Sequence, residues 1–197
     1  MKYLKTYKLF EGIETNMDVS NRGWDSLDKL PDTLIKLDCN FNNLTSLPEL
    51  PKTLKMLYCY NNHLTSLPEL PKSLIRLECH RNELTSLPEL PKTLKRLECD
   101  NNNLIILPKL PESLEKFYCY ENPLECLIPE KFIGDQKTFE NSRKWMDNYY
   151  YPMINSYEGQ KKILSHNSSN IIELKKQAKL DPRIIEEFDV AKQAEWS

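Results

Sequence analysis

The sequence predicts a solenoid in which coils of the chain stack with short parallel strands on one face, followed by an α-helical C-terminal region. Three observations predict this fold. Residues 30–129 contain five copies of one 20-residue unit, every copy carries a cysteine and an asparagine at fixed positions, and Leu-Pro pairs are absent after residue 129. A fixed period of this length indicates stacked repeats, because one copy cannot bury its leucines alone.

Residues 1–29 carry no copy of the unit, and we expect them to form an N-terminal cap. Solenoids need caps because their end coils would otherwise expose apolar side chains. Trp24 lies just before the first copy, so we expect its ring to cover that end. Residues 3–10 fit either a short strand or a short helix.

Each copy places leucines where they must point inward, as Leu34, Leu37 and Leu44 do in the first copy. The Leu-Pro-x-Leu-Pro segments that close each copy should run extended on the convex side, because proline fixes φ and lacks an N–H group. An asparagine amide can bond backbone groups through both its ends, which predicts a ladder beneath the strands. The ladder would comprise Asn42, Asn62, Asn82, Asn102 and Asn122.

In each copy a cysteine lies two residues after the strand leucine or phenylalanine, at an inward position. We expect a ladder of buried thiols that act as small apolar groups. Metal binding and disulfide formation are the alternatives, but metal ligands must converge on a point and in-register parallel neighbours have poor disulfide geometry. The five cysteines are Cys39, Cys59, Cys79, Cys99 and Cys119.

The repeat, Leu-x-x-Leu-x-Cys-x-x-Asn-x-Leu-x-x-Leu-Pro-x-Leu-Pro, resembles the leucine-rich repeat superfamily. It is similar to the short bacterial subclass found in secreted effectors of enteric pathogens, and to cysteine-bearing copies in bacteria, phages and giant viruses. The resemblance covers residues 30–129 and implies a leucine-rich repeat solenoid that binds proteins. The segment before Cys126 resembles the opening of a disulfide-bonded extracellular cap, but no cysteine follows it, which favours an intracellular protein.

Strand residues alternate, so the positions between the inward ones should face the concave side in columns. Tyrosine and arginine are common anchors of protein interfaces, so this side is the predicted binding surface. The alternative is a solvent-facing surface on which Arg76 pairs with Glu78 and Arg96 with Glu98. The candidate contact residues are Met56, Tyr58, Tyr60, Arg76, Glu78, His80, Arg96, Glu98, Asp100, Tyr118 and Tyr120.

The cluster Glu78, His80, Glu98 and Asp100 has residue types suited to metal binding or acid–base chemistry. A flat face excludes no water, however, and repeats align residue types automatically. We therefore expect no catalytic residues, no metal site and no cofactor.

Residues 130–197 carry helix signals instead of Leu-Pro units. Residues 137–150 and 154–165 are predicted helices, and Asp181-Pro182 is a typical helix start. We expect two to four helices that pack on the last repeat, with a helical interaction module as the alternative.

The charge is nearly balanced, with 27 basic and 29 acidic residues, so a nucleic-acid partner is not expected. Lysines interrupt residues 1–11 and no run of 18 apolar residues occurs, so we expect neither a signal peptide nor a membrane span. The expected protein is cytoplasmic, in host cytoplasm if it is an effector or viral protein, and monomeric.

These observations predict a non-enzymatic module that binds another protein on its concave strand face. A secreted or viral effector that scaffolds host proteins is the alternative. A third hypothesis is a remnant of a repeat-containing ubiquitin ligase, whose family uses a Cys-x-Asp motif in a large helical domain. No cysteine here has aspartate two residues later, and residues 130–197 are too few for that domain.

Overall fold

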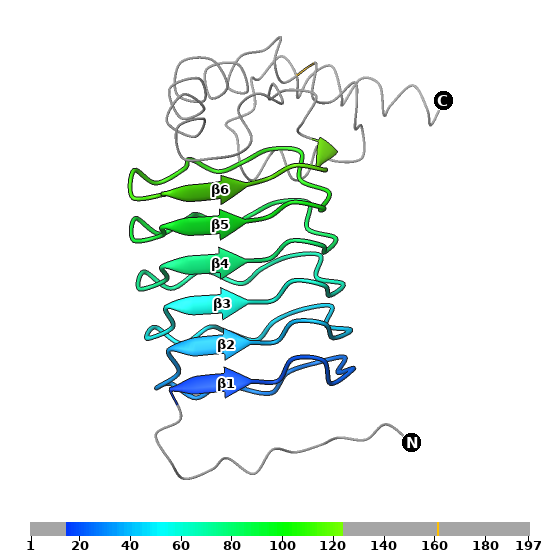
Figure 1. The fold of residues 1–197 in the computed structure, drawn as a ribbon, viewed down its shortest axis with the longest axis vertical. Coiled ribbons are helices and arrows are strands. Elements are labelled where there is room, and N and C mark those ends of the chain that lie inside the picture. The colour runs from blue at the N-terminus through cyan, green and yellow to red at the C-terminus, as the bar shows by residue number, and fades with distance from the viewer. Residues whose placement is uncertain (1–14, 124–160, 162–197) are drawn as a thin grey trace, which may run out of the picture.

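The protein folds as a stack of coils, each of which contributes one short parallel strand to a single sheet. The computed structural model describes residues 15–123 and residue 161. Six strands follow one another in the sheet in chain order, and each pairs with the next exactly one repeat later (Figure 1). The strands are β1 (Asn16–Asp18), β2 (Lys36–Asp38), β3 (Met56–Tyr58), β4 (Arg76–Glu78), β5 (Arg96–Glu98) and β6 (Lys116–Tyr118).

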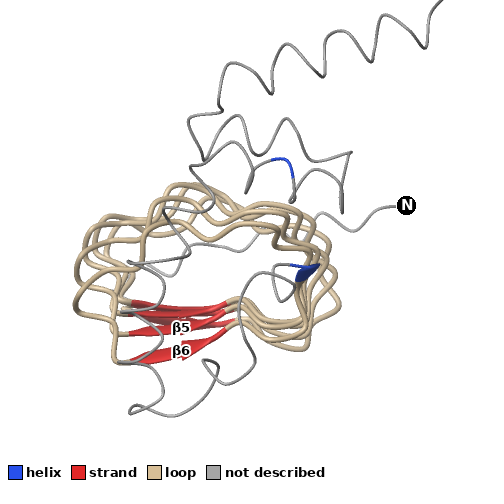
Figure 2. Ribbon diagram, turned by 90° about the horizontal axis from the view of Figure 1, so that it is seen from above, coloured by secondary structure: helices blue, strands red, loops and turns tan. Residues whose placement is uncertain are grey.

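The predicted solenoid of stacked coils with parallel strands on one face is confirmed for residues 15–123. Viewed along the stack, the strands form one side of each coil and loops form the rest, including the Leu-Pro segments (Figure 2). None of the described residues forms a helix long and apolar enough to cross a membrane. The predicted helices of residues 130–197, Cys126 and residues 3–10 lie outside the described residues.

Strand β1 was not predicted, because residues 1–29 lack the consensus residues of the repeat. Its residues nevertheless pair in register with β2, with Met17 opposite Leu37. Val19 occupies the cysteine position of this coil and is buried, while Trp24 occupies a leucine position and packs against the core. An irregular coil therefore precedes the first of the five regular copies.

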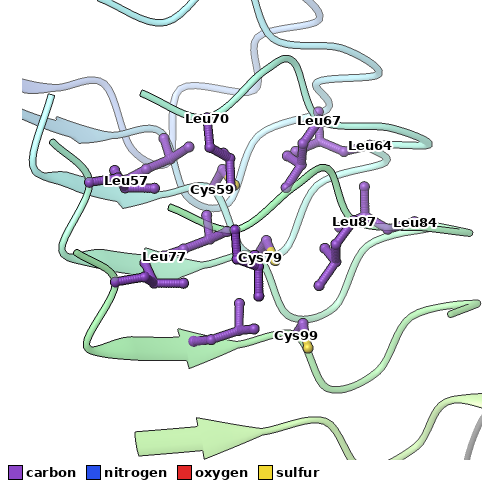
Figure 3. Close-up of a cluster of buried hydrophobic side chains, with 14 of the residues drawn as sticks. Leu57, Cys59, Leu64, Leu67, Leu70, Leu77, Cys79, Leu84, Leu87 and Cys99 are labelled. Atoms are coloured by element: carbon purple, nitrogen blue, oxygen red, sulfur yellow. The ribbon is translucent and has the colours of Figure 1, made fainter. Parts of the chain in front are cut away.

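The core is a column of leucines and cysteines inside the coils. The inward leucines of neighbouring copies stack, as Leu57 with Leu77 and Leu64 with Leu84 (Figure 3). These leucines and the cysteines between them are 0% exposed. Stacking thus gives every coil the apolar contacts that one 20-residue copy could not provide alone.

The asparagine ladder ties each coil to the one before it. The Asn82 amide nitrogen donates to the carbonyl oxygens of Cys59 and Cys79, at 3.0 and 3.1 Å, and its oxygen accepts the backbone N–H of Leu64 at 3.0 Å. The same pattern recurs at Asn62 and Asn102. The prediction that both amide ends bond backbone groups is confirmed.

A second ladder, at the entry to the strands, was not predicted. The hydroxyl of Thr53 donates to the Leu34 carbonyl oxygen at 2.8 Å, and that of Ser73 donates to the Leu54 carbonyl oxygen at 2.7 Å. Thr93 repeats the arrangement one coil later. Hydroxyl and amide ladders thus satisfy backbone groups at both ends of the strands.

A left-handed residue follows each strand and lets the chain turn under the sheet. Arg81 has a φ of 53°, and the equivalent residues of the other coils have φ between 50° and 53°. Only Asn21, Asn61 and Asn101 among them are of a type that tolerates this conformation readily. The other three are Phe41, Arg81 and Glu121.

Candidate functional site

The strand face is the surface formed by the outward residues of β2 to β6 and of the turns that follow them. Register places the residues of the first two predicted columns side by side on adjacent strands. Backbone hydrogen bonds beyond the strands, such as that from the Arg81 N–H to the Asp100 carbonyl oxygen, continue this alignment into the third and fourth columns. We number the columns from the strand entry to the strand exit. They are Lys36, Met56, Arg76, Arg96, Lys116; Asp38, Tyr58, Glu78, Glu98, Tyr118; Asn40, Tyr60, His80, Asp100, Tyr120; and Phe41, Asn61, Arg81, Asn101, Glu121.

An aromatic strip crosses three adjacent coils of this face. The rings of Tyr60 and His80 stack with centroids 4.4 Å apart and planes 10° apart. Phe41 meets Tyr60 edge to face, with centroids 5.4 Å apart. Phe41 is 52% exposed, so the strip ends in a large apolar side chain that faces solvent. Such pairs hold their rings in defined positions.

Two cations flank the Tyr58 ring in the first two columns. The Lys36 ammonium and the Arg76 guanidinium each lie 5.1 Å from the ring centroid. This distance is within the range of cation–π attraction. Tyr58 is consequently held in place on the face, half-buried, beside the charged residues of the centre.

The centre of the face is an alternating network of charge. Arg76 pairs with Glu78, and its Nε donates to the Glu78 Oε1 at 2.6 Å. Arg96 pairs with Glu98 and also lies 3.5 Å from the Glu78 Oε1. Glu78 is only 7% exposed, so the two arginines compensate a carboxylate that is shielded from water. The predicted Arg76–Glu78 and Arg96–Glu98 pairs are confirmed.

A shallow depression of about 270 Å³ lies between β4, β5 and β6. Asp100 forms part of its lining and is 5% exposed, whereas Tyr120 beside it is 42% exposed. Desolvation, and then the charge of Asp100 and a side-chain hydrogen bond with it, raise the pKa of the Tyr120 hydroxyl. The lining residues are His80, Arg81, Arg96, Glu98, Asp100, Tyr118 and Tyr120.

The residues considered for a metal or acid–base cluster, Glu78, His80, Glu98 and Asp100, do not converge on a common point on this face. His80 Nδ1 lies 3.7 Å from the nearer Glu98 oxygen, beyond hydrogen-bond distance. Within residues 15–123, no group of three or more histidine, cysteine, aspartate or glutamate side chains is arranged to hold a metal ion. Glu78 and Glu98 are instead engaged by the arginines of the first column.

The repeat cysteines lie inside the solenoid and are all 0% exposed, which confirms the predicted buried ladder. Burial raises the pKa of the Cys39 thiol to about 12, and raises that of Cys59 well above its ordinary value. The nucleophile and the metal ligand are both the thiolate, so these thiols have neither the access nor the ionisation that such chemistry requires.

Comparison with known proteins agrees with this architecture. Residues 32–72 match the family model for leucine rich repeats in two copies. The copies within this segment are leucine-rich repeats. No curated protein matches the chain in sequence.

Three solved structures show that these leucine-rich repeats match those of bacterial effectors. YopM from Yersinia enterocolitica WA-314 is 44% identical with a TM-score of 0.55, over 55% of this chain and 24% of its own. The repeat domain of a Shigella effector is 38% identical with a TM-score of 0.54, over 55% and 50% of the two chains. YopM of Yersinia pestis, described as a leucine-rich effector protein, is 43% identical with a TM-score of 0.55, over 56% and 32%. The chain thus spans no more than half the length of these proteins.

The candidate contact residues differ in their access to a partner. Tyr120 is exposed, and Met56, Tyr58, Tyr60 and Tyr118 are half-buried. Glu78 and Asp100 are buried, so they would act through their neighbours. Phe41 was not among the predicted contact residues, although it is the most exposed large apolar side chain among the described residues. Its place in the fourth column, beside Tyr60, was the available signal.

Proposed function

We propose that this protein is a non-enzymatic interaction module that binds another protein through its strand face. The observation that carries the proposal is the concentration of aromatic side chains and arginines there, ending in the exposed rings of Phe41 and Tyr120. Aromatic residues and arginine are the side chains that most often dominate binding energy at protein interfaces. The site residues remain candidates in this proposal.

The contacts within the face also support it. The arginines and glutamates of the centre are paired with one another, so a partner that covers them would bury a network already compensated in charge. The rings of Tyr58 and Tyr60 are held by neighbouring side chains, which lowers the entropy that binding must remove. The aromatic rings would therefore provide most of the contact energy.

A second candidate function is that of an effector that scaffolds proteins of a host cell. The similarity of the repeats to YopM and to the Shigella effector favours it. In this case the partner would come from a host lysate and the protein would act in the host cytoplasm. Neither candidate requires catalysis, a cofactor, nucleic acid or a membrane.

Affinity capture with three proteins would test the proposal. The strand-face variant is Phe41→Ala, Tyr58→Ala, Tyr120→Ala, which leaves the arginines in place so that Glu78 keeps its partners. The control replaces the exposed turn residues Lys52, Lys72 and Lys92 by alanine.

Wild type and control should retain the same partner. The affinity of the strand-face variant for that partner should fall by at least about tenfold, which is the loss expected when a single strong contact is removed. Host and source lysates distinguish the two candidates by where the partner is found. Equal retention by the strand-face variant would refute the face as the binding site, provided that circular dichroism shows all three proteins folded.

A further inference from the structure

Two stripes of exposed charge run along the loops that precede the strands. Their residues flank a Leu-Pro pair whose leucine is buried, such as Leu50-Pro51, and so lie three positions apart in each coil. Within every coil the two residues carry opposite charges, and all ten side chains are exposed. The first stripe is Lys29, Glu49, Glu69, Glu89 and Lys109, and the second is Asp32, Lys52, Lys72, Lys92 and Glu112.

The three central coils leave these charges unneutralised. Residues one repeat apart can pair across adjacent coils, as Lys95 and Glu115 do at 2.8 Å elsewhere on the surface. The central residues of each stripe have the same sign, so they cannot pair in this way. None of these six glutamates and lysines forms an ion pair within the described part of the chain. Two rows of opposite, unpaired charge therefore lie beside each other.

We propose that this charged edge, the surface formed by the two stripes, binds the same surface of a second copy of the chain. The twofold axis of the dimer would run parallel to the stack of coils. The rotation then places the first stripe of one copy opposite the second stripe of the other, coil against equivalent coil. Glu69 of one copy faces Lys72 of the second copy, and Lys109 faces Glu112. Opposite charges meet in every coil, and symmetry repeats each pair.

The shape of the solenoid suits this arrangement. The coils lie one above another in a single column, so two copies can run side by side along the whole length of the stripes (Figure 1). Adjacent strands of a sheet are about 4.8 Å apart, so the five positions of a stripe span roughly 19 Å. An interface of this length is small and consists of exposed ion pairs, which are individually weak and are screened by salt. The dimer should therefore be weak and sensitive to ionic strength.

The two end coils specify the register of the dimer, because their charges are reversed relative to the central coils. A shift by one coil would create like pairs at both ends, such as Lys29 against Lys52 and Glu89 against Glu112, and would leave only two opposite pairs. Like charges brought together discriminate against a wrong arrangement. The solenoid itself does not require the reversal, since these exposed side chains belong neither to its core nor to its ladders.

The charged edge shares no residue with the strand face, so this inference does not depend on the proposed function. A protein partner on the strand face and a second copy on the charged edge would use different surfaces. The proposed dimer departs from the monomer expected from the sequence.

Sedimentation equilibrium of the full-length chain at about 20 mM and about 300 mM sodium chloride tests the dimer, since charges are screened weakly at the first concentration and strongly at the second. Protein concentrations reach about 1 mM, because small interfaces bind weakly. The first-stripe variant is Glu49→Lys, Glu69→Lys, Glu89→Lys, and the second-stripe variant is Lys52→Glu, Lys72→Glu, Lys92→Glu. The exchanged variant carries all six substitutions, so it keeps the net charge of -2 and again has opposite charges in every coil.

Wild type and the exchanged variant should dimerise at low salt, and their dissociation constants should rise by about tenfold or more at high salt. Each single-stripe variant should bind itself at least about tenfold more weakly than wild type, because like charges then face each other. A monomeric wild type at low salt would overturn the proposal. So would a single-stripe variant that dimerises as tightly as wild type, or an exchanged variant that does not regain the dimer.

Two controls keep these outcomes interpretable. The strand-face variant Phe41→Ala, Tyr58→Ala, Tyr120→Ala should dimerise like wild type, and loss of the dimer in that variant would overturn the charged edge as the interface. Circular dichroism reports folding of each protein. If a three-residue variant unfolds, Glu69→Lys and Lys72→Glu are compared singly and together in the same experiment, with recovery of the dimer expected only in the pair.

Discussion

The asparagine ladder should be a principal determinant of stability, and Asn82 in the central copy is the residue on which to measure it. Replacing Asn82 by alanine removes the amide oxygen that accepts the hydrogen bond of the buried Leu64 backbone N–H. It also removes donors to the carbonyl oxygens of Cys59 and Cys79. Those two carbonyls keep one amide partner each, from Asn62 and Asn102.

These contacts set the magnitude. A buried N–H group left without a partner costs about 1–3 kcal/mol, and each of two lost bonds to carbonyls that keep another partner costs about 0.5–1 kcal/mol. Asn82→Ala should therefore lower the free energy of unfolding by about 2–5 kcal/mol. A domain has only about 5–15 kcal/mol in total, so the loss would be large.

Urea denaturation followed by far-ultraviolet circular dichroism measures this change. Asn103→Ala is the matched control, because Asn103 is an exposed residue in the next coil that bonds its neighbour through the backbone. The control should stay within about 0.5 kcal/mol of wild type. A loss below about 1 kcal/mol for Asn82→Ala, or one equal to that of the control, would refute the ladder as a major source of stability.

Three further predictions concern the backbone, the thiols and the core. Arg81→Gly should raise the free energy of unfolding by about 1 kcal/mol, because Arg81 has a φ of 53°, and Asn101→Gly should raise it less; equal gains in urea titrations would contradict this. Folding raises the pKa of the Cys39 thiol from 9.0 to about 12, so its stabilisation is complete below pH 9 and is lost as the pH rises towards 12. The stability advantage of wild type over Cys39→Ala should fall by about 1.4 kcal/mol between pH 8 and pH 10, and a constant difference would exclude the linkage. Leu77→Ala should cost about 3–5 kcal/mol and Leu47→Ala about half of that or less in the same titrations, because only Leu77 is fully buried; similar costs would disprove the graded core.

The regular coils could be predicted from the sequence because their requirements recur every 20 residues. Leucines and cysteines mark the inside of the coil, and asparagines mark the turn beneath the strand. Each residue type lies where the repeat predicts it. Strand β1 could not be predicted in this way, since Met17 and Val19 fill the inward positions with other apolar residues. The position that corresponds to the ladder asparagine is Arg22. The spacing of the apolar residues in this coil matches that of the regular copies, although the residue types differ.

The site was predictable only in its columns. Parallel register with a constant repeat length makes the neighbours of each strand residue certain, so the pairs around Glu78 followed directly. Exposure did not follow, because it depends on how long side chains of adjacent coils lie over one another. Asp100 and Tyr120 belong to the same column, yet Asp100 is 5% exposed and Tyr120 is 42% exposed.

Within each repeat, one set of residues holds the coil and another set forms the strand face, and this separation explains how the fold can serve recognition. The residues that hold the coil are nearly the same in every regular copy, with Phe117 in place of the strand leucine in the fifth, and they point into the stack or bond the backbone below it. The second and third columns carry different residues from copy to copy, such as Tyr58 next to Glu78 and Tyr60 next to His80. Substitutions in those columns change surface contacts without removing a ladder bond or a core contact. The strand face can therefore vary in sequence while the backbone that presents it stays the same.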